Sequence, residues 1–444
     1  MSLLQIETMP QVLPAEFSER RARARKLLGD DVLVLFAAPL ALRNNDVEFD
    51  YRQDSDFFYL SGFEEPEAAL VLKQDQVVLF VRPKNRERET WEGRRAGVEG
   101  AVAVFGADVA HPIGELTERL ADLLENTRRL HTFFGAEPLI DSRLAVAMGV
   151  VRSRRRKRVD APTELVDARA IVHELRLRKT EKELEAMRRA AAITASGHRR
   201  AMEVCRPGMN EFELQNAVEG EFRTQGSRRL AYSTIVGGGD NGTILHYREN
   251  DQPLVDGQLV LIDAGAEFEY YAADVTRTFP VNGKFSAIQK RAYELVLRSQ
   301  EAAIDATVVG STLDSIHDAA LSILADGFVE LGLVSADSTD RKKEAVRYYM
   351  HRTSHYLGMD VHDVGPYHRA GKPLTLDVGM VITVEPGLYV PLDDEDAPVA
   401  LRGLGIRIED DVVVTTGVPE VLTAAAPKSV PEIESACLPF GASA

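Results

Sequence analysis

Apolar runs separated by short polar segments dominate the first third of the chain. Residues 32–36 (VLVLF) are typical of a buried strand, and the basic segment 17–28 before them is a helix candidate. Residues 69–72 and 77–81 are further apolar runs joined by a polar turn, which predicts a β-hairpin. Helical periodicity returns over residues 113–124. This succession predicts an N-terminal α/β domain, which we expect to hold a mixed sheet.

A capping-box pattern marks the start of a long helix in the middle of the chain. Thr180 and Glu183 have the spacing at which each side chain can satisfy a free backbone N–H of the other residue. The helix should end before Arg206-Pro207-Gly208, because proline cannot continue it. Its predicted buried stripe consists of Leu184, Met187, Ala191 and Met202.

The remainder of the chain predicts a second domain of a different class. A length of 444 residues exceeds what one hydrophobic core usually serves. Helix candidates alternate with strand runs in no strict βαβ order, which favours an α+β domain with an antiparallel sheet. We therefore expect an N-terminal domain over residues 1–174 and a second domain over 175–444.

Composition narrows the class of protein further. The 45% hydrophobic and 27% charged residues are average for a globular protein, and the net charge of −16 argues against nucleic-acid or anionic-membrane binding. Cys205 and Cys437 form neither a metal motif nor a disulfide framework. Residues 1–20 lack the pattern of a secretory signal, and no apolar run reaches membrane-spanning length. A cytoplasmic protein is the expectation.

Two aspartates lie at predicted strand ends and supply the first candidate chemistry. Residues 259–262 lead into Asp263, and Asp274 precedes the strand candidate 275–279. The residues between them let the chain fold back, so the two carboxylates can meet. A single aspartate at a strand end is usually a turn residue, but the pair points to a shared site.

Histidines cluster further along the chain. His351, His355 and His362 lie within twelve residues, and the whole chain has only ten histidines. Beside acidic residues, such a cluster favours metal-ligand and proton-transfer roles over a structural one. His246 follows a glycine-rich loop and suits a substrate-facing proton carrier as well as it suits a turn.

Two glutamates complete the acidic set. Residues 381–384 form a strand candidate that stops at Glu385, before a proline. Alternation over residues 405–411 places Arg407 and Glu409 on one face, where the arginine would moderate carboxylate repulsion; a cross-strand ion pair is the structural alternative. Four carboxylates and one imidazole suit two divalent ions such as Mn²⁺ better than a structural zinc, and two ions indicate hydrolysis by an activated water.

These segments together resemble the pita-bread metallopeptidases of family M24, and specifically aminopeptidase P (Xaa-Pro aminopeptidase). The matching C-terminal pieces are Ile244-Leu245-His246-Tyr247, Leu261-Ile262-Asp263-Ala264-Gly265, Asp274-Val275-Thr276-Arg277-Thr278-Phe279-Pro280, Ser354-His355-Tyr356-Leu357-Gly358, Val384-Glu385-Pro386-Gly387 and Ile406-Arg407-Ile408-Glu409-Asp410. In the N-terminal part, residues 51–59, 62–67 and 91–95 also match.

The resemblance implies a fold, a cofactor and a set of residue roles. The fold is α+β, with a C-terminal pita-bread catalytic domain and an N-terminal α/β domain that serves oligomerisation and substrate access. Two Mn²⁺ ions, or Co²⁺ or Zn²⁺, would be bridged by Asp274 and Glu409, with Asp263 completing one shell and His355 and Glu385 the other. A metal-bridging hydroxide would then cut the bond before a proline in second position.

The resemblance also implies roles around the metals. The catalytic residues would be His246, His362, Glu385 and Arg407. The substrate-binding residues would be His351 and Tyr389, together with Trp91 reaching into a neighbouring subunit of a homodimer or homotetramer. Residues between Gly365 and Gly379 depart from the family pattern, and the family's usual substrate-contacting arginine is not identified there.

Other functions compete with this one. A prolidase uses the same metals but cleaves Xaa-Pro dipeptides. A pita-bread binding module or a creatinase-like hydrolase would lack metal ligands, whereas all five ligand positions are filled here. The sequence therefore favours a metallo-aminopeptidase.

Overall fold

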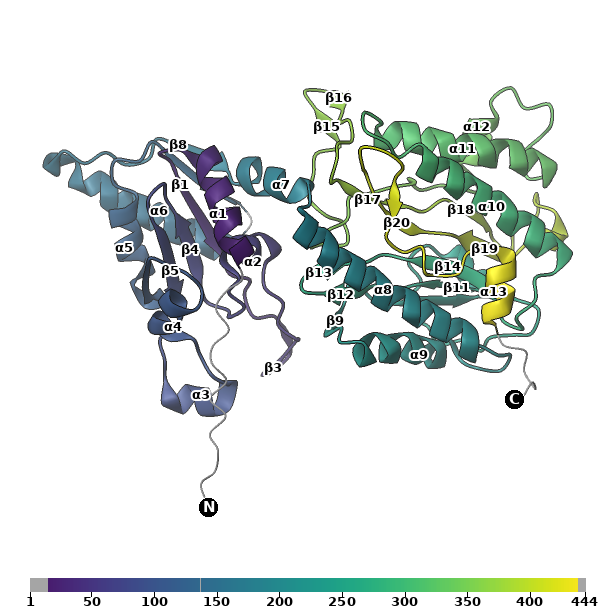
Figure 1. The fold of residues 1–444 in the computed structure, drawn as a ribbon, viewed down its shortest axis with the longest axis horizontal. Coiled ribbons are helices and arrows are strands. Elements are labelled where there is room, and N and C mark those ends of the chain that lie inside the picture. The colour runs from purple at the N-terminus through teal and green to yellow at the C-terminus, as the bar shows by residue number, and fades with distance from the viewer. Residues whose placement is uncertain (1–14, 136, 438–444) are drawn as a thin grey trace, which may run out of the picture. The chain divides into compact units, whose positions relative to one another are not determined.

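The computed structural model describes residues 15–135 and 137–437. The chain divides into two compact units, Met1–Leu175 and Arg176–Ala444 (Figure 1). In the part of the chain that is described, no helix is long and apolar enough to cross a membrane.

The first unit is built on a mixed sheet of six strands. Their bounds are β1 (Val32–Phe36), β4 (Ala69–Leu72), β5 (Val77–Val81), β6 (Val109–Pro112), β7 (Arg129–Thr132) and β8 (Glu164–Asp167). The strand order is β6-β5-β4-β1-β7-β8, antiparallel at β5-β4-β1 and parallel elsewhere. The predicted hairpin is β4–β5, with Ala69 opposite Phe80. Apolar residues at every position of β4 and β5 are buried, as the continuous runs predict.

Helices and one small hairpin complete the chain up to Leu177. They are α1 (Ala15–Leu28), β2 (Leu42–Asn44), β3 (Val47–Glu48), α2 (Ser55–Ser61), α3 (Arg86–Glu92), α4 (Gly97–Ala103), α5 (Leu116–Leu123), α6 (Pro138–Ser153) and α7 (Arg169–Leu177). The helix expected over residues 113–124 begins with a 3₁₀ turn, Ile113–Glu115, and becomes α-helical at Leu116. Leu120 of α5 and Leu144 of α6 join Val34 and Phe80 in one buried cluster.

The second unit places small antiparallel sheets among four long helices. The helices are α8 (Glu181–Val204), α9 (Glu211–Thr224), α10 (Ala287–Asp305) and α11 (Leu313–Glu330), with the short α12 (Arg341–Ala345) and α13 (Val430–Ala436). In Figure 1 the strands lie between the α8–α9 pair and the α10–α11 pair. The predicted capping box of Thr180 and Glu183 is present, the helix ends at Val204, and all four stripe residues are buried.

The strands that build the site belong to three antiparallel sheets. Their bounds are β10 (Ile235–Gly238), β11 (Leu259–Asp263), β14 (Thr276–Pro280), β17 (Val381–Val384), β18 (Gly387–Val390), β19 (Leu404–Arg407), β20 (Asp410–Val413) and β21 (Glu420–Val421). They pair as β10-β11-β14, β17-β20-β21 and β18-β19. Outside these sheets lie β9 (Arg229–Leu230), β12 (Ala266–Phe268), β13 (Tyr271–Ala272), β15 (His368–Arg369) and β16 (Lys372–Pro373). The expected α+β class with antiparallel pairing is confirmed.

One predicted strand is interrupted. Residues 405–411 alternate as one strand would, but β19 ends at Arg407 and β20 begins at Asp410, because the two halves pair with different partners. The partners β17 and β18 are themselves separated at Pro386, whose carbonyl accepts from the Ile408 N–H (3.3 Å). Glu409 therefore lies in the gap, where its N–H donates to the carbonyl of Thr276 (3.1 Å).

Candidate active site

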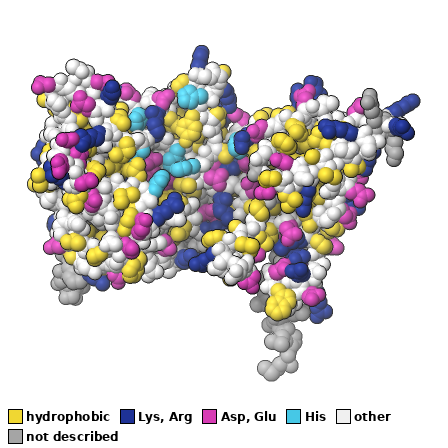
Figure 2. Space-filling model, turned by 180° about the vertical axis from the view of Figure 1, so that it is seen from behind, with side chains coloured by type: hydrophobic (Ala, Val, Ile, Leu, Met, Phe, Trp, Pro, Cys, Tyr) yellow, Lys and Arg dark blue, Asp and Glu magenta, His cyan; other side chains and the backbone are white. Residues whose placement is uncertain are grey.

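The five predicted metal ligands share one cavity of about 670 Å³ in the second unit. The cavity is lined by Tyr232, Ser233, Ile235, Leu245, His246, Arg248, Asp263, Asp274, His351, Arg352, Ser354, His355, Val361, His362, Tyr367, Glu385, Arg407 and Glu409. Figure 2 shows histidine side chains (cyan) gathered on one face of the molecule. Residues from separate strands and loops thus meet around a single space.

Strand ends position the carboxylates. Asp263 is the last residue of β11 and pairs in register with Thr276 of β14, so Asp274, two residues before Thr276, lies at the same edge. Glu385 directly follows β17. His355 lies on a loop that runs beside this strand end, because its carbonyl accepts from the Thr383 N–H (3.0 Å). The strands therefore end at the cavity, and the polar side chains at their ends line it.

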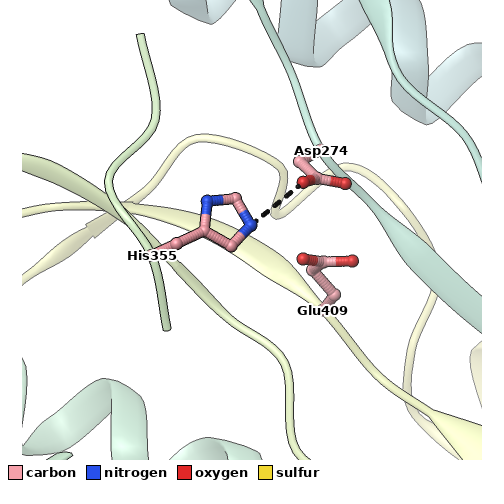
Figure 3. Close-up of side chains that lie close together, drawn as sticks. All are labelled: Asp274, His355 and Glu409. Atoms are coloured by element: carbon pink, nitrogen blue, oxygen red, sulfur yellow. Dashed lines mark ion pairs between the residues drawn. The ribbon is translucent and has the colours of Figure 1, made fainter. Parts of the chain in front are cut away.

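Asp274, His355 and Glu409 form the closest part of this cluster. Each offers a ligand atom within 4.8 Å of the other two, and Figure 3 shows their side chains directed toward one another. His355 Nε2 lies 3.4 Å from Asp274 Oδ2 and 3.6 Å from Glu385 Oε1. Asp263 lies outside this trio and is held by other partners.

Crowding of buried carboxylates controls the electrostatics. Burial raises the pKa of Glu409 well above its usual range, and the charges of Asp274 and Glu385 raise it further. Burial likewise raises the pKa of Glu385 to about 7, while His355 opposes the shift. Burial disfavours charged His355, but its contacts with Asp274 and Glu385 prevail and raise its pKa to about 9. The carboxylates give the cavity an excess of negative charge, which bound cations would neutralise.

Tyr232 links the two aspartates. Its hydroxyl oxygen lies 2.6 Å from Asp263 Oδ1 and 2.5 Å from Asp274 Oδ1. A phenol carries one hydrogen, so it donates to one carboxylate at a time. The second short contact between oxygens needs a proton or a cation to balance it. Together with the hard oxygen donors, this arrangement fits divalent metal ions.

Sequence reasoning missed Tyr232, which lies between β9 and β10 in a segment without periodicity. Tyr232→Phe removes the hydroxyl while keeping the ring, so we expect metal affinity to fall about 10- to 100-fold, as for other outer-shell partners of metal ligands. Titration of metal-free protein with Mn²⁺, followed by calorimetry, measures the change. An unchanged affinity would show that the phenol does not orient Asp263 and Asp274.

Arg407 is buried and connects several residues of the site. Its Nη2 donates to Asp263 Oδ2 (2.6 Å) and its Nε donates to Thr276 Oγ1 (3.0 Å), which in turn donates to Glu409 Oε2 (2.6 Å). Arg407 thus contacts Asp263 directly and Glu409 through Thr276, and its positive charge opposes the rise in the pKa of both carboxyls.

Hydrogen bonds fix the protonation of His351. Because the carbonyl of Arg352 can only accept, the neutral ring of His351 holds its hydrogen on Nδ1 and donates it to that carbonyl (2.8 Å). His351 Nε2 then accepts from the Tyr389 hydroxyl (2.8 Å), which itself accepts from Arg407 Nη1 (3.1 Å). Burial, aided by the charge of Arg407, lowers the pKa of His351 to about 3. The uncharged His351 ring therefore forms part of the cavity wall.

The other predicted site residues lie in different surroundings. His246 and His362 line the cavity, with the His362 ring 4.3 Å from that of His355, and burial lowers the pKa of His362. Tyr389 is fully buried behind His351 and is not among the lining residues. Trp91 belongs to α3 of the first unit, where 85% of its surface is exposed.

Comparison with known proteins agrees with this geometry. Residues 185–416 match metallopeptidase family M24, and residues 17–132 match the aminopeptidase P N-terminal domain. The Xaa-Pro aminopeptidase of Escherichia coli K12 is 42% identical over 435 residues, covering 96% of this chain and 98% of that protein. Aminopeptidase PepP of Pseudomonas aeruginosa is 45% identical with a TM-score of 0.94, covering 97% and 99% of the two chains. Zn-substituted E. coli aminopeptidase P in complex with product has a TM-score of 0.92 at 42% identity, covering 96% and 98%.

A pita-bread domain with buried carboxylates and histidines around one cavity defines a metallopeptidase. The chain belongs to metallopeptidase family M24 and, within it, to the aminopeptidase P group, as the resemblance of its motifs predicted. It is a metallo-aminopeptidase.

Proposed function

We propose that this protein is a dinuclear-metal Xaa-Pro aminopeptidase that releases the first residue of peptides with proline in second position. The observation that carries this proposal is the convergence of four carboxylates and His355 in one cavity. The relatives from Escherichia coli and Haemophilus influenzae, which align with this chain over nearly their whole length, are Xaa-Pro aminopeptidases by name, which supports the same substrate class.

The donor set divides between two ions, for which Mn²⁺ is our choice over Co²⁺ or Zn²⁺. Asp274 and Glu409 would bridge both ions, Asp263 would complete one shell, and His355 and Glu385 would complete the other. When bound, such a pair would activate a water as the nucleophile near neutral pH, a mechanism class that includes aminopeptidases. Because one relative is a zinc-substituted aminopeptidase P, activity measured in parallel with Mn²⁺, Co²⁺ and Zn²⁺ identifies the ion that this protein uses.

The chain's own residues then handle the substrate. Glu385 would take up the proton of the attacking water and pass it to the leaving proline nitrogen. His246 and His362, both on the cavity wall, would donate hydrogen bonds to the carbonyl oxygen as charge develops there. The proline ring has no N–H and a fixed shape, which suits the neutral ring of His351.

Peptide length separates this function from that of a prolidase. We expect Mn²⁺-loaded protein to cleave Xaa-Pro-Xaa tripeptides at least about tenfold more efficiently than Xaa-Pro dipeptides. This ratio corresponds to ~1.4 kcal/mol of additional transition-state stabilisation for the tripeptide. Xaa-Ala-Xaa should resist cleavage. Chromatographic detection of the released first residue measures all three rates. Cleavage of dipeptides alone would favour the prolidase, and no cleavage at all would overturn the proposal.

We further propose that the N-terminal domain, residues 1–174, serves assembly into a homodimer or homotetramer. Support comes from Trp91, whose ring is exposed in α3, a helix with no buried residue. Light scattering of the wild type and of Trp91→Ala would test whether this ring joins subunits. A cytoplasmic location stays a prediction.

A further inference from the structure

We propose that Arg248 binds the free C-terminal carboxylate of a short peptide substrate and so determines the enzyme's preference for small peptides. Arg248 lines the catalytic cavity and is exposed, whereas Asp263, Asp274 and Glu409 in the same cavity are buried. The arginine therefore lies toward the mouth and the carboxylates toward the interior. This inference rests on the proposed peptidase function and deepens it.

The loop that carries Arg248 is firmly held. Tyr247 is buried, and its hydroxyl donates to Glu211 Oε2 (2.9 Å). Asn250 is also buried: its amide donates to the carbonyl of Thr234 (2.9 Å), and its oxygen accepts from the Val236 N–H (2.9 Å). With Tyr247 anchored inward, the flanking side chains of His246 and Arg248 both border the cavity. A rigid loop thus presents one imidazole and one guanidinium to the same space.

Arg248 differs from the other arginines of the cavity in having no side-chain partner among the residues that the structure describes. Arg407 is bonded to Asp263 and Tyr389, and Arg352 forms an ion pair with Asp314. Within residues 15–135 and 137–437, no side chain receives a hydrogen bond or ion pair from the Arg248 guanidinium. The neighbouring Glu249 carboxylate accepts instead from the backbone N–H of Arg248 (3.1 Å). One full positive charge at the mouth is therefore available to a ligand.

The chemistry of a peptide matches this polarity. When the bond after the first residue lies at the proposed metal ligands in the interior, the C-terminal carboxylate of a short peptide lies toward the mouth, where a cation can bind it. A guanidinium binds a carboxylate through two parallel hydrogen bonds and keeps its charge at any physiological pH. On a chain with a net charge of −16, an uncompensated arginine at this place offsets the repulsion that an anionic terminus would otherwise meet.

The test compares matched tripeptides, Xaa-Pro-Xaa with a free carboxylate and the same peptide with a C-terminal amide. We expect the wild type to prefer the free acid about tenfold in kcat/KM, mainly through KM, since a charge-assisted hydrogen bond that persists from ground state to transition state acts on binding. Arg248→Gln should abolish the preference by lowering kcat/KM for the free-acid peptide alone. Arg248→Lys should retain part of the preference.

Arg223→Gln is the matched control, because Arg223 is exposed on α9, does not line the cavity and carries the same charge. This control variant should leave unchanged the ratio of kcat/KM for the free-acid peptide to kcat/KM for the amide peptide. That result would exclude a general effect of net charge. If Arg248→Gln leaves the ratio intact, or lowers both substrates equally, the assignment of Arg248 is wrong while the peptidase function stands. If the wild type cleaves neither peptide, the proposed function itself fails and the assignment falls with it.

Discussion

Glu409→Gln is expected to reduce turnover of an Xaa-Pro-Xaa peptide by at least about a thousandfold, since metal ions contribute several kcal/mol of transition-state stabilisation. The amide keeps the shape of the side chain but removes one of the two charges proposed to bridge the ions. It also retains one oxygen that can accept from Thr276 Oγ1, so the local hydrogen bond can survive. The loss should therefore appear in metal content and rate rather than in folding.

The stability of the metal-free variant provides the control. A buried carboxyl with a raised pKa binds its proton more tightly in the folded than in the unfolded state, so folding stability falls as pH rises from the unfolded toward the folded pKa of Glu409. Glutamine removes that penalty. Metal-free Glu409→Gln should hence be at least as stable as the metal-free wild type at pH 7, and its stability should depend less on pH.

Thermal unfolding between pH 5 and 8, together with metal analysis by mass spectrometry, checks both parts. A variant that binds two ions and turns over normally would contradict the assignment of Glu409. A variant that simply unfolds would contradict the electrostatic account of the site, since relief of carboxylate crowding should not destabilise the fold.

Local patterns predicted many of the carboxylates and histidines that line the cavity. Asp263, Glu385 and their strands could be found because each apolar run stops at a carboxylate, and the histidine cluster is visible in the sequence itself. These features depend on a few neighbouring residues. The resemblance of the motifs then supplied the roles that these residues are expected to have around the metal ions.

Features that depend on distant partners could not be predicted in the same way. The break between Arg407 and Glu409 arises because β19 and β20 pair with different strands, which no alternation pattern reveals. Tyr232 belongs to an irregular segment, and its role depends on two aspartates that are remote in sequence. The preference of Arg407 for Asp263 over Glu409 likewise depends on how β11 lies beside β19.

Arg277 shows how far the support of the site extends into the core. Its side chain is fully buried, and Nη2 donates to Asp410 Oδ1 (2.7 Å), where both partners have 0% exposed side-chain surface. Its Nη1 donates to the carbonyl of Glu409 (2.6 Å), and its Nε donates to that of Pro427 (3.0 Å). One guanidinium therefore joins the C-terminal segment to the backbone of a proposed metal ligand.

Arg277→Met is expected to destabilise the protein by about 3–5 kcal/mol, because it leaves the Asp410 charge buried with fewer partners. Burial alone would raise the pKa of Asp410, but Arg277 and Lys428 hold it well below its usual range. Without Arg277 the folded-state pKa of Asp410 must rise toward or above its unfolded value, so the part of the stability that is lost through Asp410 on acidification should be smaller in the variant than in the wild type.

Arg188→Met is the matched control, since Arg188 forms a comparably short pair with Glu420 but remains about one-third exposed (side-chain exposures of 35% and 39%). Exposed pairs contribute roughly 0–1 kcal/mol, so this substitution should be nearly neutral. Urea unfolding of both variants without metal gives the two free energies directly. Equal losses would mean that burial of the Arg277–Asp410 pair does not matter. A selective loss in Arg277→Met, restored in part by the additional change Asp410→Asn, would show that the unpaired buried charge is the cause.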